Sequence, residues 1–244
     1  DSDVILDEIH TYSSEIQAIV LKIIEMLKTI GCRIHVGTAT MPTVLYNKIL
    51  ELLGGKSKVY EVSLPNNILE TFNRHIIHKV ADFESCNNIV KQAVAENKKI
   101  LIVCNQVKRS QMLYNEIGEE YPDVDRMLIH SRFKRNDRAR LETSLKADFN
   151  ASKNSCIVVS TQVVEVSLDI SFDVMITECA PIDAMIQRFG RINRKRTDET
   201  IGKYKDIYVI QPPEDKSDAL PYDLDVLQKS FDVLPQDALL EEAT

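Results

Sequence analysis

Three side chains near residue 190 have the chemistry to bind a polyphosphate. Gln187, Arg191 and Arg194 follow Pro181 in a stretch with helical spacing. At 100° per residue they fall within about 60° of one another, so one amide and two guanidiniums would project from one helix face. The planar guanidinium bonds two phosphate oxygens at once and stays charged. The alternative is a solvated basic helix end, where the helix dipole favours cations in any case. Arg188, about 100° from Gln187, would belong to another face.

A pair of carboxylates near the start of the chain suits a metal–nucleotide complex. Asp7 and Glu8 follow the short apolar run Val4–Leu6, which has the character of a buried strand. A carboxylate at the carboxyl end of a strand can hold Mg²⁺, usually through water, beside nucleotide phosphates. The alternative is an ordinary polar strand end.

Polar and basic residues follow two further apolar runs. Ile157–Val159 and Val174–Ile176 are typical of buried parallel strands, and the first leads into Ser160, Thr161 and Gln162. In an open α/β sheet, ligands bind at such carboxyl ends. The strand predicted at 127–129 likewise leads into a basic segment of five residues, namely Arg132, Lys134, Arg135, Arg138 and Arg140. Hydroxyls and amides beside a helix N-terminus suit a DNA phosphate, whereas the alternative is a solvated basic helix.

These segments resemble motifs of superfamily-2 helicases. The run Gln187-Arg-Phe-Gly-Arg-Ile-Asn-Arg194 resembles motif VI, and it lies about 25 residues after a segment that resembles motif V. The segment Thr161-Gln-Val-Val-Glu-Val-Ser-Leu-Asp169, followed by Ala180-Pro-Ile-Asp183, most resembles the CRISPR-associated helicase of type I systems. That family is the helicase part of the helicase–nuclease that degrades invader DNA. Weaker but ordered matches extend from residue 4 to about residue 210.

The resemblance implies catalytic and coupling roles in the first part of the chain. Asp7-Glu8-Ile9-His10 resembles the DExH box, in which Asp7 and Glu8 hold Mg²⁺ through water and Glu8 polarises the attacking water. His10 would sense the γ-phosphate. Thr38-Ala39-Thr40 resembles motif III, usually Ser-Ala-Thr, which couples hydrolysis to nucleic-acid binding.

The resemblance also implies a binding site in the second part. The nucleic-acid backbone would contact Ser131, Arg132, Arg135, Thr161 and Gln162. Asp169 would reach the nucleotide ribose. Gln187, Arg191 and Arg194 would act on ATP, which the family binds between two lobes, opposite Asp7 and Glu8.

The stretch Gly54-Gly-Lys-Ser57 is not predicted to be a phosphate loop. That motif needs a glycine at the position of Leu50 and must follow a strand, whereas Thr43–Leu53 is predicted to be a helix. Because the family places its phosphate loop before the DExH box, we expect a fragment that begins within a lobe and has little ATPase activity alone.

Regular alternation of strands and helices predicts the fold class. Strands are expected at 33–37, 74–80, 100–104, 127–129, 156–160 and 206–210, and helices at 14–29, 43–53, 84–96, 107–118 and 136–147. This order indicates an α/β fold with parallel sheets and flanking helices. With the resemblance, we expect RecA-like lobes: residues 1–63 as the C-terminal part of lobe 1, 64–72 as a linker, 73–212 as a complete lobe 2 and 213–244 as an acidic tail. Leu220, Leu224, Leu227 and Phe231 would lie on one amphipathic helix of that tail.

Charge, cysteines and hydropathy limit the classes of protein to which this chain could belong. The net charge of −7 comes from the last 31 residues, which hold nine acidic and two basic residues and leave 28 of each sign elsewhere. Local basic patches would therefore contact phosphates. The five cysteines form no Cys-x-x-Cys pair, and four lie in or beside apolar runs, as in a reduced, cytoplasmic protein without structural zinc. No apolar run approaches the roughly 20 residues that span a bilayer, and no signal peptide is expected.

The function expected from this resemblance is ATP-dependent translocation on single-stranded DNA in type I CRISPR interference, with ATP and Mg²⁺ as cofactors. Expected partners are single-stranded DNA, a CRISPR RNA-guided surveillance complex and an HD nuclease domain, with no membrane. Two alternatives remain: another superfamily-2 RNA or DNA-repair helicase, and a non-catalytic nucleic-acid-binding module.

Overall fold

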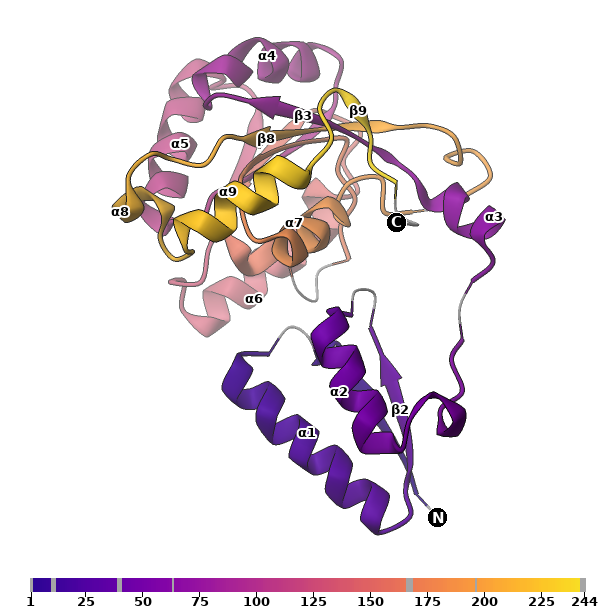
Figure 1. Cartoon of the computed structure of the whole chain (residues 1–244). Coiled ribbons are helices and arrows are strands. Elements are labelled where there is room, and N and C mark those ends of the chain that lie inside the picture. The colour runs from indigo at the N-terminus through magenta and orange to yellow at the C-terminus, as the bar shows by residue number, and fades with distance from the viewer. Residues whose placement is uncertain are drawn as a thin grey trace. The chain divides into compact units, whose positions relative to one another are not determined.

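The chain divides into two compact α/β units. The computed structural model describes residues 2–9, 12–38, 41–62, 64–165, 169–195 and 197–241. Unit 1 is Asp1–Leu64 and unit 2 is Pro65–Thr244 (Figure 1). In the part of the chain that is described, no helix is long and apolar enough to cross a membrane. The five cysteines are free thiols, and Cys86, Cys104, Cys156 and Cys179 are buried, as expected.

Unit 1 is built on two parallel strands and two helices. Its elements are β1 (Asp3–Asp7), α1 (Ser14–Thr29), β2 (Arg33–Gly37), α2 (Thr43–Leu53) and the 3₁₀ turn η2 (Lys56–Lys58). The pairing of Asp7 with Gly37 brings the carboxyl ends of both strands together. Its core contains Ile9, Ile24, Leu45 and Ile49. The rejection of a phosphate loop at residues 54–57 is confirmed, because this stretch follows helix α2 and Gly54 ends that helix in the left-handed conformation.

Helix α1 has the predicted bounds but buries less of its apolar face than expected. Ile24 is fully buried, whereas Ile16, Ile19, Ile23, Met26 and Ile30 are exposed. These five residues recur at spacings of three and four, so they form one stripe along the helix. Exposed apolar stripes of this kind commonly mark interaction surfaces.

Unit 2 contains a seven-stranded sheet. The segment expected to be a linker holds two helical turns, α3 (Asn66–Leu69) and η3 (Glu70–Phe72). The sheet has the order β5-β6-β4-β7-β8-β3-β9, and all pairs are parallel except β3 with β9. Its strands are β3 (His75–Val80), β4 (Lys99–Val103), β5 (Asp125–Ile129), β6 (Cys156–Ser160), β7 (Val174–Glu178), β8 (Lys205–Ile210) and β9 (Ala238–Leu239).

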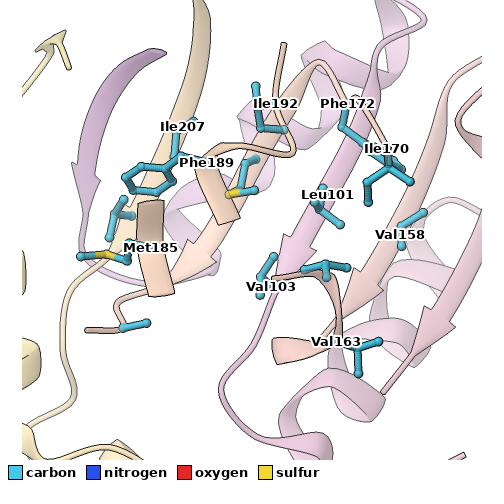
Figure 2. Close-up of a cluster of buried hydrophobic side chains, with 14 of the residues drawn as sticks. Leu101, Val103, Val158, Val163, Ile170, Phe172, Met185, Phe189, Ile192 and Ile207 are labelled. Carbon is cyan, nitrogen blue, oxygen red and sulfur yellow. The ribbon is translucent and has the colours of Figure 1, made fainter. Parts of the chain in front are cut away.

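Helices cover both faces of this sheet, as the α/β prediction required. They are α4 (Asn87–Ala95), preceded by η4 (Glu84–Cys86), α5 (Val107–Glu120), α6 (Arg135–Ser144), the π-helical turn η5 (Leu145–Phe149), α7 (Ile182–Phe189), α8 (Lys216–Ala219) and α9 (Leu224–Val233). Alternate strand residues face opposite sides: Leu101 and Val103 pack with α7 and α9, whereas Ile100 and Ile102 pack with α4 and α5. Figure 2 shows part of the first core, including Met185 and Phe189 of α7.

One expectation about the end of the chain is wrong, and one strand was not expected. Strand β8 lies between β7 and β3, and the unexpected strand β9 pairs with the outer side of β3. The expected amphipathic helix begins only at Leu224, because Pro221 cannot continue a helix and Asp223 caps the first turn through the backbone N–H groups of Asp225 and Val226. Leu220 therefore lies outside the helix and is exposed. The acidic region packs on unit 2 through Ala219, Leu227 and Leu234, which are buried in the core.

Candidate functional site

The carboxylates of unit 1 lie where the sequence predicts, at the carboxyl ends of its two strands. Asp7 is the last residue of β1, and the backbone N–H of Glu8 donates to the carbonyl oxygen of Gly37 over 2.9 Å. Thr38 follows β2 directly, so it lies beside this pair of strand ends. Glu8 has a positive φ of 51°, which turns the chain sharply after Asp7. His10, Ala39 and Thr40 lie outside the described residues.

This strand end fits a Mg²⁺ ion bound together with a nucleotide. Asp7 is exposed, so its carboxylate is accessible to hydrated ions. Within the described ranges no cluster of three or more His, Cys, Asp or Glu side chains could hold a metal ion by itself. Magnesium in nucleotide sites is held by one or two carboxylates together with phosphates and water, so Asp7 and Glu8 suffice for such a site.

In unit 2, the predicted nucleic-acid residues lie at the ends of two neighbouring strands. Ile129 of β5 pairs with Ser160 of β6, and the backbone N–H of Thr161 donates to the carbonyl oxygen of Ile129 over 3.3 Å. Ser131 and Arg132, which follow β5, are exposed, as is Arg135 at the start of α6.

The basic segment continues this exposed edge. Lys134, Arg135, Asn136, Asp137 and Arg140 line a shallow hollow of about 440 Å³ at the first turns of α6. Arg138 differs from the others, because it pairs with Glu142 over 2.8 Å within the helix. Four basic side chains therefore remain around the hollow and the end of β5: Arg132, Lys134, Arg135 and Arg140.

Thr161 and Gln162 are less accessible than this basic edge. Thr161 is 1% exposed, and its hydroxyl has no hydrogen-bond partner among the described residues. The Nδ1 atom of His130, at the end of β5, is likewise buried without a described partner, and burial lowers the pKa of this imidazole. The side-chain amide of Gln162 donates to the carbonyl oxygen of Asn105 over 2.9 Å.

The predicted single helix face for Gln187, Arg191 and Arg194 is wrong. Helix α7 ends at Phe189, so only Gln187 lies on it. After Gly190 the backbone pairs with Phe172: the N–H of Phe172 donates to the carbonyl oxygen of Arg191 over 2.9 Å, and the N–H of Asn193 donates to the carbonyl oxygen of Phe172 over 3.2 Å. The N–H groups of Arg191 and Ile192 donate to the carbonyl oxygens of Arg188 and Phe189, three residues back, so the chain leaves the helix in a turn where the sequence pattern predicts that the helix continues.

Arg191 and Arg194 instead bind the loop that follows β6. The guanidinium of Arg191 is buried and donates to the carbonyl oxygens of Val164 and Glu165 over 2.7 and 2.6 Å. The guanidinium of Arg194 pairs with the Asp169 carboxylate over 3.0 Å, and these side chains are 40% and 73% exposed. The structure thus brings together Asp169 and Arg194, two residues predicted to bind the nucleotide, on an accessible surface.

Arg188, which the helix pattern predicts to face away from the site, is the largest fully buried side chain of unit 2. Its Nε donates to Glu165 over 2.8 Å, and its remaining nitrogens donate to Thr177, to the carbonyl oxygen of Glu178 and to Asn105 over 2.9 Å each. These partners come from the ends of β4, β6 and β7. We call this set the Arg188 network.

The surroundings raise the pKa values of two carboxyl groups around this network. Burial raises the pKa of Glu165, against the opposing effect of the Arg188 guanidinium. Burial likewise raises the pKa of Glu178, although its carboxylate accepts from the Asn105 N–H and pairs with Arg109 over 2.9 Å. Both side chains are largely buried, at 14% and 17% exposed, so removal of a partner is costly.

The sequence interpretation missed Glu165 and Asn105, and it misplaced Arg188. A signal for Arg188 was present, because Met185, Arg188 and Phe189 have the spacing of one helix face and all three are buried. An arginine on an apolar face requires a buried carboxylate, and Glu165 lies in the apolar stretch that follows β6.

Comparisons with known proteins show which proteins this chain resembles. The family model described as CRISPR-associated nuclease/helicase Cas3, C-terminal, matches residues 96–197. The CRISPR-associated nuclease/helicase Cas3 of Methanothermobacter thermautotrophicus is 30% identical over 96% of this chain. The chain spans 28% of the length of that relative.

Solved structures agree in fold. The crystal structure of T. fusca Cas3 matches with a TM-score of 0.80 and 21% identity, over 93% of this chain and 32% of that one. Its complex with AMPPNP matches with a TM-score of 0.78 and 19% identity, over 98% and 33%. A CRISPR RNA-guided surveillance complex, pre-nicking, contains a chain that matches with a TM-score of 0.71 and 19% identity, over 96% and 36%.

Proposed function

We propose that this chain is part of a CRISPR-associated Cas3 helicase, which it resembles over nearly its whole length, and that it serves in an ATP-driven translocase on single-stranded DNA in type I CRISPR interference. The observation that carries the proposal is the loop after β6. Thr161 and Gln162 begin it at the basic strand edge, and the arginines after α7 hold its later residues. A movement of Arg191 or Arg194 would therefore be transmitted through this loop to Thr161 and Gln162 at the nucleic-acid edge.

We propose that single-stranded DNA lies along the ends of β5 and β6. The exposed basic residues there, together with the first turn of α6, suit the phosphate backbone. Thr161 and Gln162 would contact the strand after a local rearrangement, because Thr161 is buried and the Gln162 amide already has a partner.

We propose that ATP with Mg²⁺ uses Asp7 and Glu8 of unit 1 and Asp169, Gln187, Arg191 and Arg194 of unit 2. Asp7 and Glu8 would hold the ion, which supplies charge neutralisation at the phosphates when bound. Arg194 is accessible on the surface of its unit, and a phosphate could compete with Asp169 for its guanidinium. The complex of T. fusca Cas3 with AMPPNP supports nucleotide binding by this fold.

The division of the chain supports a two-lobe organisation. We propose that unit 1 is the C-terminal part of a larger RecA-like lobe, that unit 2 is lobe 2, and that Thr38, Ala39 and Thr40 couple hydrolysis to nucleic-acid binding. The exposed apolar stripe of α1 supports a larger lobe, because such a stripe is normally covered. We further propose that the whole protein works with a CRISPR RNA-guided surveillance complex and with a nuclease domain. One matching structure is named as such a complex, and the relative is named as a nuclease/helicase.

Single-stranded DNA binding tests this proposal most directly. Each phosphate contact contributes about 0.7 to the slope of log K against log salt for single strands, so Arg132→Ala with Arg135→Ala should reduce the slope by about 1.4. Fluorescence anisotropy of a labelled oligothymidylate at several salt concentrations measures this. Lys91→Ala with Lys229→Ala removes the same charge from exposed positions on α4 and α9 and should leave the slope nearly unchanged.

An unchanged slope in the Arg132 and Arg135 variant would return these residues to the solvated-helix alternative. A parallel series with oligouridylate separates the CRISPR assignment from an RNA helicase. Clearly tighter binding of RNA than of DNA would contradict the proposed substrate.

A further inference from the structure

The acidic tail, residues 213–244, has no role in the proposed function. Its first part lies next to the proposed nucleic-acid edge. We call residues 214–223 the acidic segment; it carries Glu214, Asp215, Asp218 and Asp223 against a single lysine, Lys216. Helix α8 lies within it, and Ala219 anchors it in the core of unit 2. Its position is therefore fixed by packing.

The first connection to the strand edge is Gln106, which follows β4. Its side-chain amide lies within hydrogen-bonding distance of three carbonyl oxygens of the acidic segment, those of Ser217, Asp218 and Leu220, at 3.2, 3.3 and 3.1 Å. Since β4 is the neighbour of β6 in the sheet, this contact holds the segment one strand away from Thr161 and Gln162.

The second feature is charge at the ends of β4 and β7. Glu214 and Asp218 line a hollow of about 540 Å³ together with Gln106 and Glu178 from these strand ends and with Lys108 and Arg109 from the start of α5. Arg109 is already paired with Glu178. The Asp218 carboxylate contributes to the raised pKa of Glu178, after the larger effect of burial. Its negative charge therefore acts at the strand ends, where it repels a phosphate backbone.

We propose that the acidic segment bounds the nucleic-acid track and restrains binding, with Glu214 and Asp218 repelling the backbone beyond β4. The proposal rests on the proposed function of the strand edge. It confines the strand to the ends of β5 and β6, next to the basic segment. Phosphates that pass β4 meet acidic side chains instead.

Anisotropy with labelled oligothymidylate tests this proposal on the full chain. Glu214→Gln with Asp218→Asn should tighten binding about threefold at low salt, and this gain should vanish at high salt, because ions screen exposed charges.

A matched control has the same charge change at the opposite edge of the sheet. Asp198 and Glu199 are exposed and precede β8, so Asp198→Asn with Glu199→Gln should change affinity clearly less than the Glu214 and Asp218 variant. Equal gains in both variants would show only an effect of net charge and would overturn the proposal.

The Arg132 and Arg135 variant in the same assay separates the two proposals. If it loses salt-dependent affinity while the acidic-segment variants bind like the wild type, the track is real and the acidic segment does not bound it. If it binds like the wild type, the proposed function itself fails at this edge.

Discussion

Replacement of Arg188 by alanine should destabilise unit 2 far more than replacement of any exposed arginine. The side chain is 0% exposed and makes four hydrogen bonds, one of them to the Glu165 carboxylate. Its removal leaves a carboxylate and other polar groups buried without their donor. Breaking a buried ion pair from one side costs about 3–5 kcal/mol. With a urea dependence of about 2 kcal/mol per molar, the unfolding midpoint should fall by about 1.5–2.5 M.

Arg194→Ala is the matched control. It removes an arginine six residues later that also pairs with a carboxylate, but this pair is largely exposed. Exposed pairs contribute about 0.2–1 kcal/mol, so its urea midpoint should move by no more than about 0.5 M. Arg188→Lys keeps the charge but loses the planar fork, so its midpoint should lie between those of Arg188→Ala and the wild type. Glu165→Gln should also destabilise, since Arg188 would then keep its buried charge among neutral partners.

Urea unfolding followed by far-ultraviolet circular dichroism measures these midpoints. If Arg188→Ala and Arg194→Ala shift the midpoint equally, the Arg188 network does not stabilise unit 2. The assignment of Arg188 to the interior would then be wrong.

Two further predictions concern the nucleotide and the C-terminal strand. In a protein that hydrolyses ATP and carries this chain, Arg191→Ala should lower DNA-stimulated turnover by at least about 10²-fold with DNA affinity nearly unchanged, and a selective loss of DNA affinity would refute the nucleotide role. Burial lowers the pKa of His78, but its bonds to Asp206 and Asp237, over 2.9 and 2.7 Å, raise it overall. A raised folded-state pKa adds stability below about pH 6.5 that is lost as pH rises through the folded value. The melting temperature of wild type minus that of His78→Gln should therefore fall between pH 6 and pH 8, and a difference that stays constant or grows would contradict this.

Much of the fold could be predicted because its signals are local. Strands β2 and β6 and helices α1 and α2 have the predicted bounds, since their apolar periodicity and their end signals, such as Gly54, agree. The sheet order and the antiparallel β9 could not be predicted, because a two-residue strand has no periodicity and its partner lies far away in sequence.

The candidate site was predictable in composition but not in geometry. Strand ends gave the positions of Asp7, Glu8, Thr161 and Gln162, since parallel strands present their carboxyl ends at one edge. The end of α7 was missed because the pairing of Phe172 with the segment after Gly190 is tertiary and overrides helical spacing. The roles of these residues toward ATP and DNA stay predictions.

Strand β9 also has a consequence for synthesis on the ribosome. His78 and Asp237, which lie beside the β3–β9 pairing, are separated by 159 residues. At about 5–20 residues per second, β3 leaves the ribosome roughly 8–30 s before β9 follows. Its other partner, β8, is also among the later residues. We therefore expect nascent chains to carry β3 unpaired until β8 and β9 have emerged, which makes them clients for chaperones and vulnerable to strand-to-strand association on crowded polysomes.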